Sequence, residues 1–270
     1  MKIEFLICTY NEGIYKIENL IMEENKDIRY LISHQITKSN LNISDCDFLK
    51  RKDIEYYSLY NKGVSKNRNN LLSKASGDIC FISDDDVVYD MSNIRAVIKA
   101  FSENPDLDIY VGKIETYKGE PEYKEYSHKH KKLKLKDIGS VSSIEMVLRR
   151  SSFENSGVIF DERFGLGGKL YPKGEEAIFL SDCLKQGLKI EYFPQYIVKH
   201  PKESSASSVA YDAKETEYMG ALSARIFKKI AILAGIAFSI KHFNRYKNYF
   251  SPIKYLHYFK KGINNLNKNS

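Results

Sequence analysis

The chain has 270 residues, of which 43% are hydrophobic, 29% are charged and 6 are proline. This composition excludes a disordered protein, and the length suits one large domain with an appendage. The four cysteines show neither zinc-ribbon spacing nor a disulfide framework, and the N-terminal segment has no signal-peptide pattern, so we expect a cytoplasmic protein.

The net charge of +7 is unevenly distributed along the chain. Residues 218–270 contain no Asp or Glu. Their basic residues are Arg225, Lys228, Lys229, Lys241, Arg245, Lys247, Lys254, Lys260, Lys261 and Lys268. This tail alone makes the protein basic, which points to a partner of opposite charge.

The first half of the chain alternates between predicted strands and predicted helices. Residues 3–8 and 28–33 have strand character, and residues 13–21 between them carry isoleucines at helical spacing. Residues 64–77 form a predicted helix that Ser65 caps and Gly77 ends, before a strand over 78–83, a helix over 93–101 and a strand over 107–116. The alternation predicts an α/β domain with a largely parallel sheet, whose strands bind ligands at their carboxyl ends.

The second half begins with a charged segment, residues 118–136, which predicts an exposed, mobile loop. His128 and His130 within it are interpreted as solvated rather than as metal ligands. Residues 142–153 predict a strand running into a helix, and residues 188–193 predict another strand. Between them, residues 173–187 predict a helix preceded by Gly174 and ended by Gly187.

Three adjacent carboxylates, Asp84, Asp85 and Asp86, directly follow the apolar strand at 78–83. Neighbouring carboxylates repel one another, and a divalent cation is the common reason for holding them together. A solvated acidic turn that ends the strand is the other interpretation. The triplet alone does not separate the two.

Several short motifs follow one another in a defined order. They are Thr9-Tyr10-Asn11-Glu12, Gly63 with Arg68-Asn69, Asp84-Asp85-Asp86, Phe160-Asp161-Glu162 with Phe164, Glu175-Glu176 and His200. Together they resemble the motifs of family 2 glycosyltransferases with the GT-A fold, of the kind that acts in bacterial polysaccharide and surface-glycan pathways. The resemblance runs from about residue 2 to residue 210.

The resemblance implies a role for each motif. Residues 9–12 and Arg68 would hold the nucleotide, Asp84 and Asp85 would contact the nucleotide-sugar, and Asp86 with Asp84 and His200 would bind Mn²⁺ or Mg²⁺. Glu176 would be the catalytic base, with Glu175 as the alternative. The polar stretch 201–207 would close over the donor, and the loop at 165–168 would be a flexible part of the acceptor side.

Besides Asn67, which stands where Ala is usual, the sequence departs from the family pattern in two places. Ser33-His34-Gln35 ends the second strand where many relatives carry acidic residues and a Gly-Ser turn, so the nucleotide is open. Glu176 replaces the usual Asp and adds one methylene to the base. Non-functional interpretations also stay open for two residues. Glu is favoured in any first helical turn, whether or not it is catalytic, and a hydrogen-bonded His200 is typical of a strand end.

The chemistry of sugar transfer requires the same kinds of group. A leaving diphosphate needs a cation on its oxygens, and an acceptor hydroxyl needs a base for its proton. We therefore predict a metal-dependent, inverting glycosyltransferase that moves a sugar, most fittingly UDP-linked, to a glycan or lipid-linked glycan. A sugar-phosphate nucleotidyltransferase is the enzymatic alternative, although residues 9–13 lack the basic residues it needs. A non-enzymatic basic scaffold is the other.

The domain prediction is a GT-A domain over residues 1–215 and a basic, mainly helical tail over 216–270. The uncharged stretch 230–240 is too short to cross a bilayer, which takes about 20 residues. The tail is therefore interpreted either as a helix on an anionic membrane surface or as one packed on the domain. Nucleic acid is not expected, since no nucleic-acid-binding motif accompanies the charges.

Overall fold

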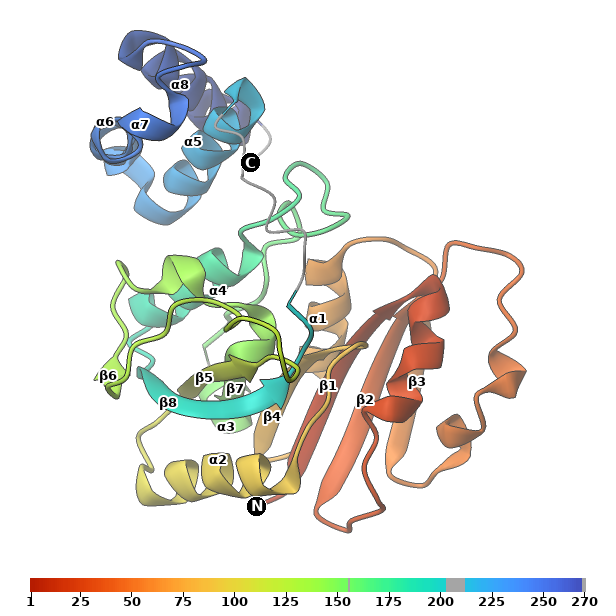
Figure 1. The fold of residues 1–270 in the computed structure, drawn as a ribbon. Coiled ribbons are helices and arrows are strands. Elements are labelled where there is room, and N and C mark those ends of the chain that lie inside the picture. The colour runs from red at the N-terminus through yellow and green to blue at the C-terminus, as the bar shows by residue number, and fades with distance from the viewer. Residues whose placement is uncertain (155, 203–211, 269–270) are drawn as a thin grey trace. The chain divides into compact units, whose positions relative to one another are not determined.

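The computed structural model describes residues 1–154, 156–202 and 212–268, and its chain divides into two compact units, residues 1–202 and 203–270 (Figure 1). The boundary expected at residue 215, between the GT-A domain and the basic tail, stays a prediction. Most of the polar stretch 201–207, which was expected to close over a donor, lies outside the described residues.

Unit 1 is built on one sheet of eight strands in the order β3-β2-β1-β4-β7-β5-β8-β6. The strands are β1 (Ile3–Tyr10), β2 (Ile28–Gln35), β3 (Ile54–Leu59), β4 (Ile79–Asp84), β5 (Ile109–Glu115), β6 (Lys131–Lys132), β7 (Met146–Arg149) and β8 (Ile190–Lys199). The predicted strands at 3–8, 28–33, 78–83 and 107–116 are confirmed.

The sheet is mixed, so the prediction of a largely parallel sheet is wrong for its second half. β1, β2, β3 and β4 are parallel neighbours, and β5 is parallel to β8. β7 runs antiparallel between β4 and β5, and β6 is antiparallel to β8. An antiparallel neighbour needs no crossover helix, and the chain between β5 and β7 accordingly contains only short 3₁₀ turns and β6.

Helices cover both faces of the sheet (Figure 1). In β1, Phe5 and Ile7 pack in one cluster with the apolar residues of η1 (Asn11–Asn19) and α2 (Met91–Glu103). Leu6 and Cys8 point the other way, into a cluster with residues of α1 (Val64–Lys74) and α4 (Glu175–Lys185). This alternation is the period of two of a strand buried on both faces.

The segment predicted as an α-helix at 13–21 is instead the 3₁₀ helix η1. Its buried apolar side chains are Ile14 and Ile17, and Leu20 follows directly after it. A spacing of three residues places side chains on one line in a 3₁₀ helix, with three residues per turn. The remaining short helices of unit 1 are η2 (Ile43–Asp45), η3 (Asp47–Lys50), η4 (Ile138–Ser140), η5 (Ser143–Glu145) and α3 (Arg150–Glu154).

The charged segment 118–136 is not an exposed loop throughout, which corrects the prediction. Tyr126 and Leu133 are buried in the cluster that also contains residues of β5 and α4. The Tyr126 hydroxyl accepts a hydrogen bond from the backbone N–H of Ile114 at 3.0 Å. His130 contacts Glu191 with an Nε2 to Oε2 distance of 2.8 Å. One aromatic and one aliphatic side chain thus hold a largely basic segment against the sheet.

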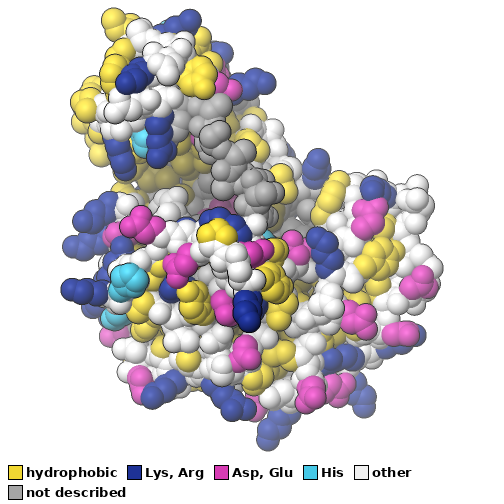
Figure 2. Space-filling view, in the orientation of Figure 1, with side chains coloured by type: hydrophobic (Ala, Val, Ile, Leu, Met, Phe, Trp, Pro, Cys, Tyr) yellow, Lys and Arg dark blue, Asp and Glu magenta, His cyan; other side chains and the backbone are white. Residues whose placement is uncertain are grey.

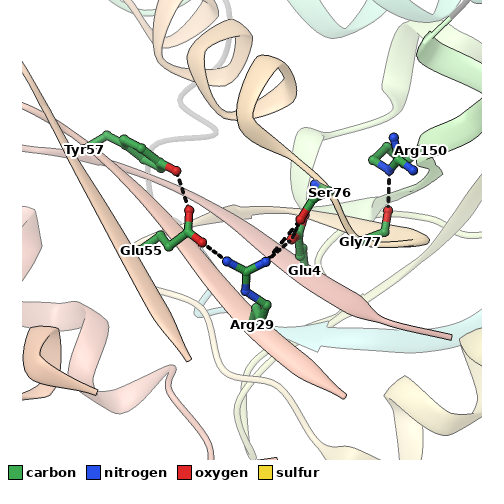
Figure 3. A network of polar contacts seen from close by, with 7 residues as sticks. All are labelled: Glu4, Arg29, Glu55, Tyr57, Ser76, Gly77 and Arg150. Atoms are coloured by element: carbon green, nitrogen blue, oxygen red, sulfur yellow. Dashed lines mark hydrogen bonds and ion pairs between the residues drawn. The ribbon is translucent and has the colours of Figure 1, made fainter. Parts of the chain in front are cut away.

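A buried carboxylate joins the amino-terminal halves of the parallel strands (Figure 3). Glu4 of β1 has no exposed surface and accepts hydrogen bonds from the Ser76 backbone N–H at 2.7 Å and the Ser76 hydroxyl at 2.8 Å. Arg29 of β2 lies 3.5 Å from Glu4 and also pairs with Glu55 of β3. A Cβ at Gly77 would lie 2.9 Å from Cγ of Glu4, which explains the glycine after α1.

Unit 2 is helical, which confirms the predicted helical character of the tail. Its elements are α5 (Ala213–Phe227), η6 (Lys228–Ile230), α6 (Ala231–Lys241), α7 (Phe243–Tyr246) and α8 (Pro252–Lys268). Tyr246, Tyr255 and Phe259 form its buried aromatic core. Among the described residues, no helix has both the length and the apolar character needed to span a membrane.

Two glycines allow α5 and α8 to cross closely. A Cβ at Gly262 would lie 1.8 Å from the carbonyl oxygen of Glu217, and one at Gly220 would lie 2.0 Å from that of Phe259. Both distances are far below van der Waals contact. The backbones therefore pack against each other where any side chain would separate them.

We predict that Gly262→Ala destabilises unit 2. Alanine improves intrinsic helix propensity by about 1 kcal/mol, but forcing packed backbones apart costs about 1–3 kcal/mol or more, so the clash decides the sign. Thermal unfolding followed by circular dichroism at the helix band should show a lower melting temperature. Gly139→Ala is the control, because nothing lies within 4 Å of its Cβ position. Equal melting temperatures for both variants would contradict the close crossing.

Candidate active site

The carboxyl ends of β1 and β4 bring the first predicted site residues together. The two strands are parallel neighbours in which Cys8 pairs with Asp84, so the residues that follow lie at one edge of the sheet. There the Thr9 hydroxyl donates a 2.6 Å hydrogen bond to Oδ2 of Asp85. A Cβ at Gly13 would lie 2.0 Å from the same oxygen. Gly13, which no motif singled out, thus makes room for the carboxylate of Asp85.

The turn after β1 is held by Thr37, a residue that the sequence analysis missed. Asn11 has a left-handed backbone (φ 47°), which asparagine tolerates better than most residues. Its Oδ1 accepts a hydrogen bond from the Thr37 backbone N–H at 2.9 Å, and the Tyr10 hydroxyl lies 2.7 Å from Oγ1 of Thr37. Glu12 points to solvent and pairs with Lys38, which lowers the pKa of its carboxyl.

The residues that depart from the family pattern support this turn. His34 has no exposed surface, and its burial lowers its pKa, so the ring is neutral at pH 7. Its Nε2 lies 2.8 Å from the Asn11 carbonyl oxygen and its Nδ1 lies 2.9 Å from the Tyr56 hydroxyl. A neutral ring that donates from Nε2 to the carbonyl accepts from the tyrosine at Nδ1. Gln35 donates to the Gly63 carbonyl at 3.0 Å, which supports the start of α1.

Arg68 is the hub of the site. Its side chain is 4% exposed, and Nη1 lies 3.0 Å from Oε1 of Glu175 and 3.6 Å from Oε1 of Glu176. Nη2 lies 3.5 Å from Oδ1 of Asp84 and donates a 2.7 Å hydrogen bond to the Ser143 hydroxyl. The structure therefore brings together three predicted carboxylates around a guanidinium that was expected to contact the nucleotide.

The turn before α1 positions Arg68. The helix begins after Gly63, whose φ of +124° is open to glycine, and not at a Ser65 cap as predicted. The Ser65 hydroxyl donates instead to the Phe164 carbonyl at 2.6 Å, and the Val64 N–H donates to the Leu166 carbonyl at 2.9 Å. The loop at 165–168, interpreted as flexible, is thus hydrogen-bonded to the first turn of α1.

Glu176 is more accessible to solvent than Glu175. Both lie in the first turn of α4, after Gly174 in a left-handed conformation. The Glu176 side chain is 21% exposed, whereas that of Glu175 is 7% exposed. Removal of water by the surrounding protein raises the pKa of Glu176 to about 7, and Glu175 adds to the rise while Arg68 opposes it. A carboxyl of this kind can both hold and release a proton near neutral pH.

Asp86 and His200 form the pair of groups that could share a cation. The bridge between Val88 and Lys199 brings the two segments together, and Nε2 of His200 lies 3.3 Å from Oδ1 of Asp86. This contact lowers the pKa of Asp86. Nδ1 of His200 lies 2.7 Å from the Pro201 carbonyl oxygen. A ring that donates there from Nδ1 could present its Nε2 lone pair to a bound cation in place of this contact, as in histidines that bind metals.

Two protein ligands suit a cation whose remaining ligands would come from substrate phosphates and water. Within residues 1–154, 156–202 and 212–268, no group of three or more His, Cys, Asp or Glu could hold a metal. Asp84, a predicted ligand, contacts Arg68. Mg²⁺ is commonly held in proteins by one or two carboxylates with phosphates and water. Two ligands about 2.1 Å from an octahedral ion lie about 3 Å apart, close to the observed 3.3 Å.

A comparison with family models decides the class of the protein. Residues 34–157 match the model of glycosyl transferase family 2. Over these residues, a little under half of the chain, the sequence is that of a family 2 glycosyltransferase domain. The matched segment includes Arg68 and Asp84–Asp86, while residues 9–12, Glu175, Glu176 and His200 lie outside it. A search of the curated proteins found none that matches this sequence.

Solved structures of S. aureus TarS share the fold. TarS 1–349 in complex with UDP-GlcNAc has a TM-score of 0.69 and 15% identity over 98% of this chain and 89% of that chain. TarS 1–349 in complex with UDP has a TM-score of 0.65 and 13% identity, with the same two coverages. A third TarS structure has a TM-score of 0.63 and 14% identity over 92% of this chain and 44% of that chain. The predicted GT-A fold of this glycosyltransferase is confirmed.

We predict that Glu176→Gln stabilises the protein more at pH 8 than at pH 5. A carboxyl whose pKa rises from 4.5 to about 7 on folding binds its proton more tightly in the folded state. Stability therefore falls as the pH rises through that window, by up to about 3 kcal/mol, and a glutamine escapes this cost. Melting temperatures at both pH values check it. Glu103→Gln, whose carboxylate is 62% exposed, is the control. A Glu176→Gln gain of equal size at pH 5 would refute the raised pKa.

Proposed function

We propose that this glycosyltransferase moves a sugar from a nucleotide-sugar, most fittingly UDP-linked, to a glycan hydroxyl with inversion at the anomeric carbon. The observation that carries the proposal is the Arg68 hub, which holds Glu176 and Asp84 against one guanidinium at the carboxyl edge of the sheet. These contacts support the assignment of Glu176 as the base and of Asp84 as a donor-side residue of the same site. The synthesis of a bacterial surface glycan is the process that these parts serve.

The donor class is supported by fold and local geometry. Two of the TarS structures contain UDP-GlcNAc and UDP. In this chain the turn that would face the nucleotide, residues 9–12, is fixed by Thr37 and His34, with Tyr10 43% exposed and available for stacking. Asp85, which accepts a hydrogen bond from Thr9, would contact the ribose or the sugar of the donor. Arg68 acts here as a positioning residue, since its charge is directed to carboxylates.

A divalent cation, Mn²⁺ or Mg²⁺, fits the donors on Asp86 and His200, and these residues would hold it. When bound, it supplies positive charge to the diphosphate oxygens. Lys16, whose Nζ lies 3.8 Å from Oδ2 of Asp86, adds a further positive charge on the same side. The negative charge of a leaving diphosphate would therefore meet two kinds of cation.

The transfer step requires one base. The acceptor oxygen forms a bond to the anomeric carbon while the bond from that carbon to the diphosphate oxygen breaks, and the diphosphate leaves with the electron pair. The hydroxyl proton passes to Glu176, whose pKa of about 7 suits proton uptake at neutral pH. Arg68 limits the rise of that pKa and so keeps part of the Glu176 population ionised. A single displacement of this kind inverts the anomeric configuration.

The acceptor that best fits the basic tail is a lipid-linked glycan. Residues 218–270 carry basic side chains without any acidic one, and anionic lipids attract such segments. We therefore propose that the protein works as a peripheral protein on the inner face of the plasma membrane.

We expect Glu176→Gln to lower the transfer rate about 10²- to 10⁴-fold, the usual contribution of a positioned base. The wild-type rate should rise with pH and level off above about pH 7, because the ionised form of Glu176 accepts the proton. Release of UDP from a panel of UDP-sugars, with glycan and lipid-linked acceptors, measures the rate. Glu103→Gln should leave it unchanged. A product that retains the donor's anomeric configuration would exclude a single-base displacement.

We also expect UDP with Mn²⁺ to raise the melting temperature, and neither alone to do so to the same extent. Ligand at 100 times its dissociation constant stabilises by about 2.7 kcal/mol. Asp86→Asn should abolish the metal-dependent part, whereas Asp106→Asn, an aspartate 81% exposed, should retain it. Parallel measurements with GDP, CDP and dTDP identify which nucleobase the site prefers. An unchanged metal effect in Asp86→Asn would count against Asp86 as a ligand.

A further inference from the structure

The helix α6 presents its large apolar side chains outward. Its exposed residues Ile232, Leu233, Ile236 and Ile240 have between 40% and 75% of their surface accessible. Its buried residues are the small ones, Ala231, Gly235 and Ser239. A helix of a water-soluble domain shows the opposite arrangement, with large apolar residues inside and polar ones outside.

Contacts in the core of unit 2 fix this orientation. A Cβ at Gly235 would lie 2.7 Å from two ring carbons of Phe259, so the helix and the ring pack in direct contact. The Ser239 hydroxyl lies 2.7 Å from the hydroxyl of Tyr246 in the same core. Rotation of α6 to bury the isoleucines would break both contacts and place branched side chains against Phe259. The outward apolar face is thus part of the fold of this unit.

The exposed apolar surface extends beyond both ends of α6. Ile230, 57% exposed, precedes the helix, and Phe243, 43% exposed, follows it. We call Ile230, Ile232, Leu233, Ile236, Ile240 and Phe243 the α6 face. Exposed lysines border it, with Lys228 and Lys229 before the helix and Lys241 at its end. Figure 2 shows hydrophobic and basic side chains side by side on the helical unit.

We propose that the α6 face docks on an anionic lipid surface, with the helix lying in the plane of the interface. The inference deepens the proposed function, on which it rests only for the lipid-linked acceptor. A helix of 11 residues is too short to cross a bilayer, which takes about 20. Its apolar side chains enter the acyl boundary while the bordering lysines meet lipid phosphates. Two such signals together are what stable peripheral binding requires.

The charges favour lipid over a second copy of the chain. Residues 218–270 contain no Asp or Glu. Two α6 faces brought together would therefore oppose lysines with lysines, and like charges across an interface disfavour association. A surface of anionic headgroups supplies the opposite charge on every side of the apolar face. The complementarity of both charge and polarity points to this one partner.

The test is flotation of the full chain with vesicles of phosphatidylcholine alone or mixed with phosphatidylglycerol, without donor or metal. We expect binding to the anionic vesicles, weakened by salt. The double variant Leu233→Glu/Ile236→Glu should lower the partition coefficient at least about tenfold. Ile159→Glu is the matched control, since Ile159 is an isoleucine of unit 1 with 60% exposure. Its binding should equal that of the wild type.

Several outcomes would overturn the proposal. One is equal vesicle binding by the double variant and the wild type. A second is a concentration-dependent dimer in light scattering that the double variant loses, because it would assign the α6 face to a second copy. A third is a lowered melting temperature of the double variant, because exposed side chains tolerate Glu and buried ones do not. Vesicle binding without sugar transfer would overturn the proposed function and leave the docking surface intact.

Discussion

The site depends on one buried guanidinium that faces three carboxylates. Arg68 lies within 3.0 to 3.6 Å of oxygens on Glu175, Glu176 and Asp84. Burial of the Glu176 carboxyl is the main cause of its raised pKa of about 7, while Arg68 opposes the rise and Glu175 adds to it. The proton affinity of the proposed base is therefore set by its burial and by the charges gathered around one guanidinium.

The sheet supplies the frame in which these charges meet. Parallel pairing of β1 with β4 places Thr9 beside Asp85. The turn after β1 is held by a hydrogen bond between the buried His34 and the Asn11 carbonyl. The start of α1 is joined by a hydroxyl hydrogen bond to Phe164 and by a backbone hydrogen bond to Leu166. Thr9, Asp85 and the turn after β1 thus lie at neighbouring strand ends, where an α/β sheet places its ligands.

The two units follow opposite packing rules. In unit 1, alternating apolar residues of β1 are buried on both faces beneath helices. In unit 2, glycines and other small residues bring helices into close contact, and α6 turns its isoleucines outward. The first arrangement suits a domain surrounded by water. The second leaves apolar side chains of α6 exposed, and such a surface is suited to contact with a partner.

The sequence by itself determined four strands of the first half, although not β3, together with the acidic triplet at a strand end, the family resemblance and the basic helical tail. Each of these depends on local period, composition or the order of short motifs. Only the tertiary structure decided the antiparallel β7, the Arg68 hub, the Thr37 and His34 supports and the outward face of α6. The contact of Arg68 with Glu175 joins residues 107 positions apart, and that of Thr9 with Asp85 spans 76. Such pairings are set by how strands and helices pack, which no local pattern encodes.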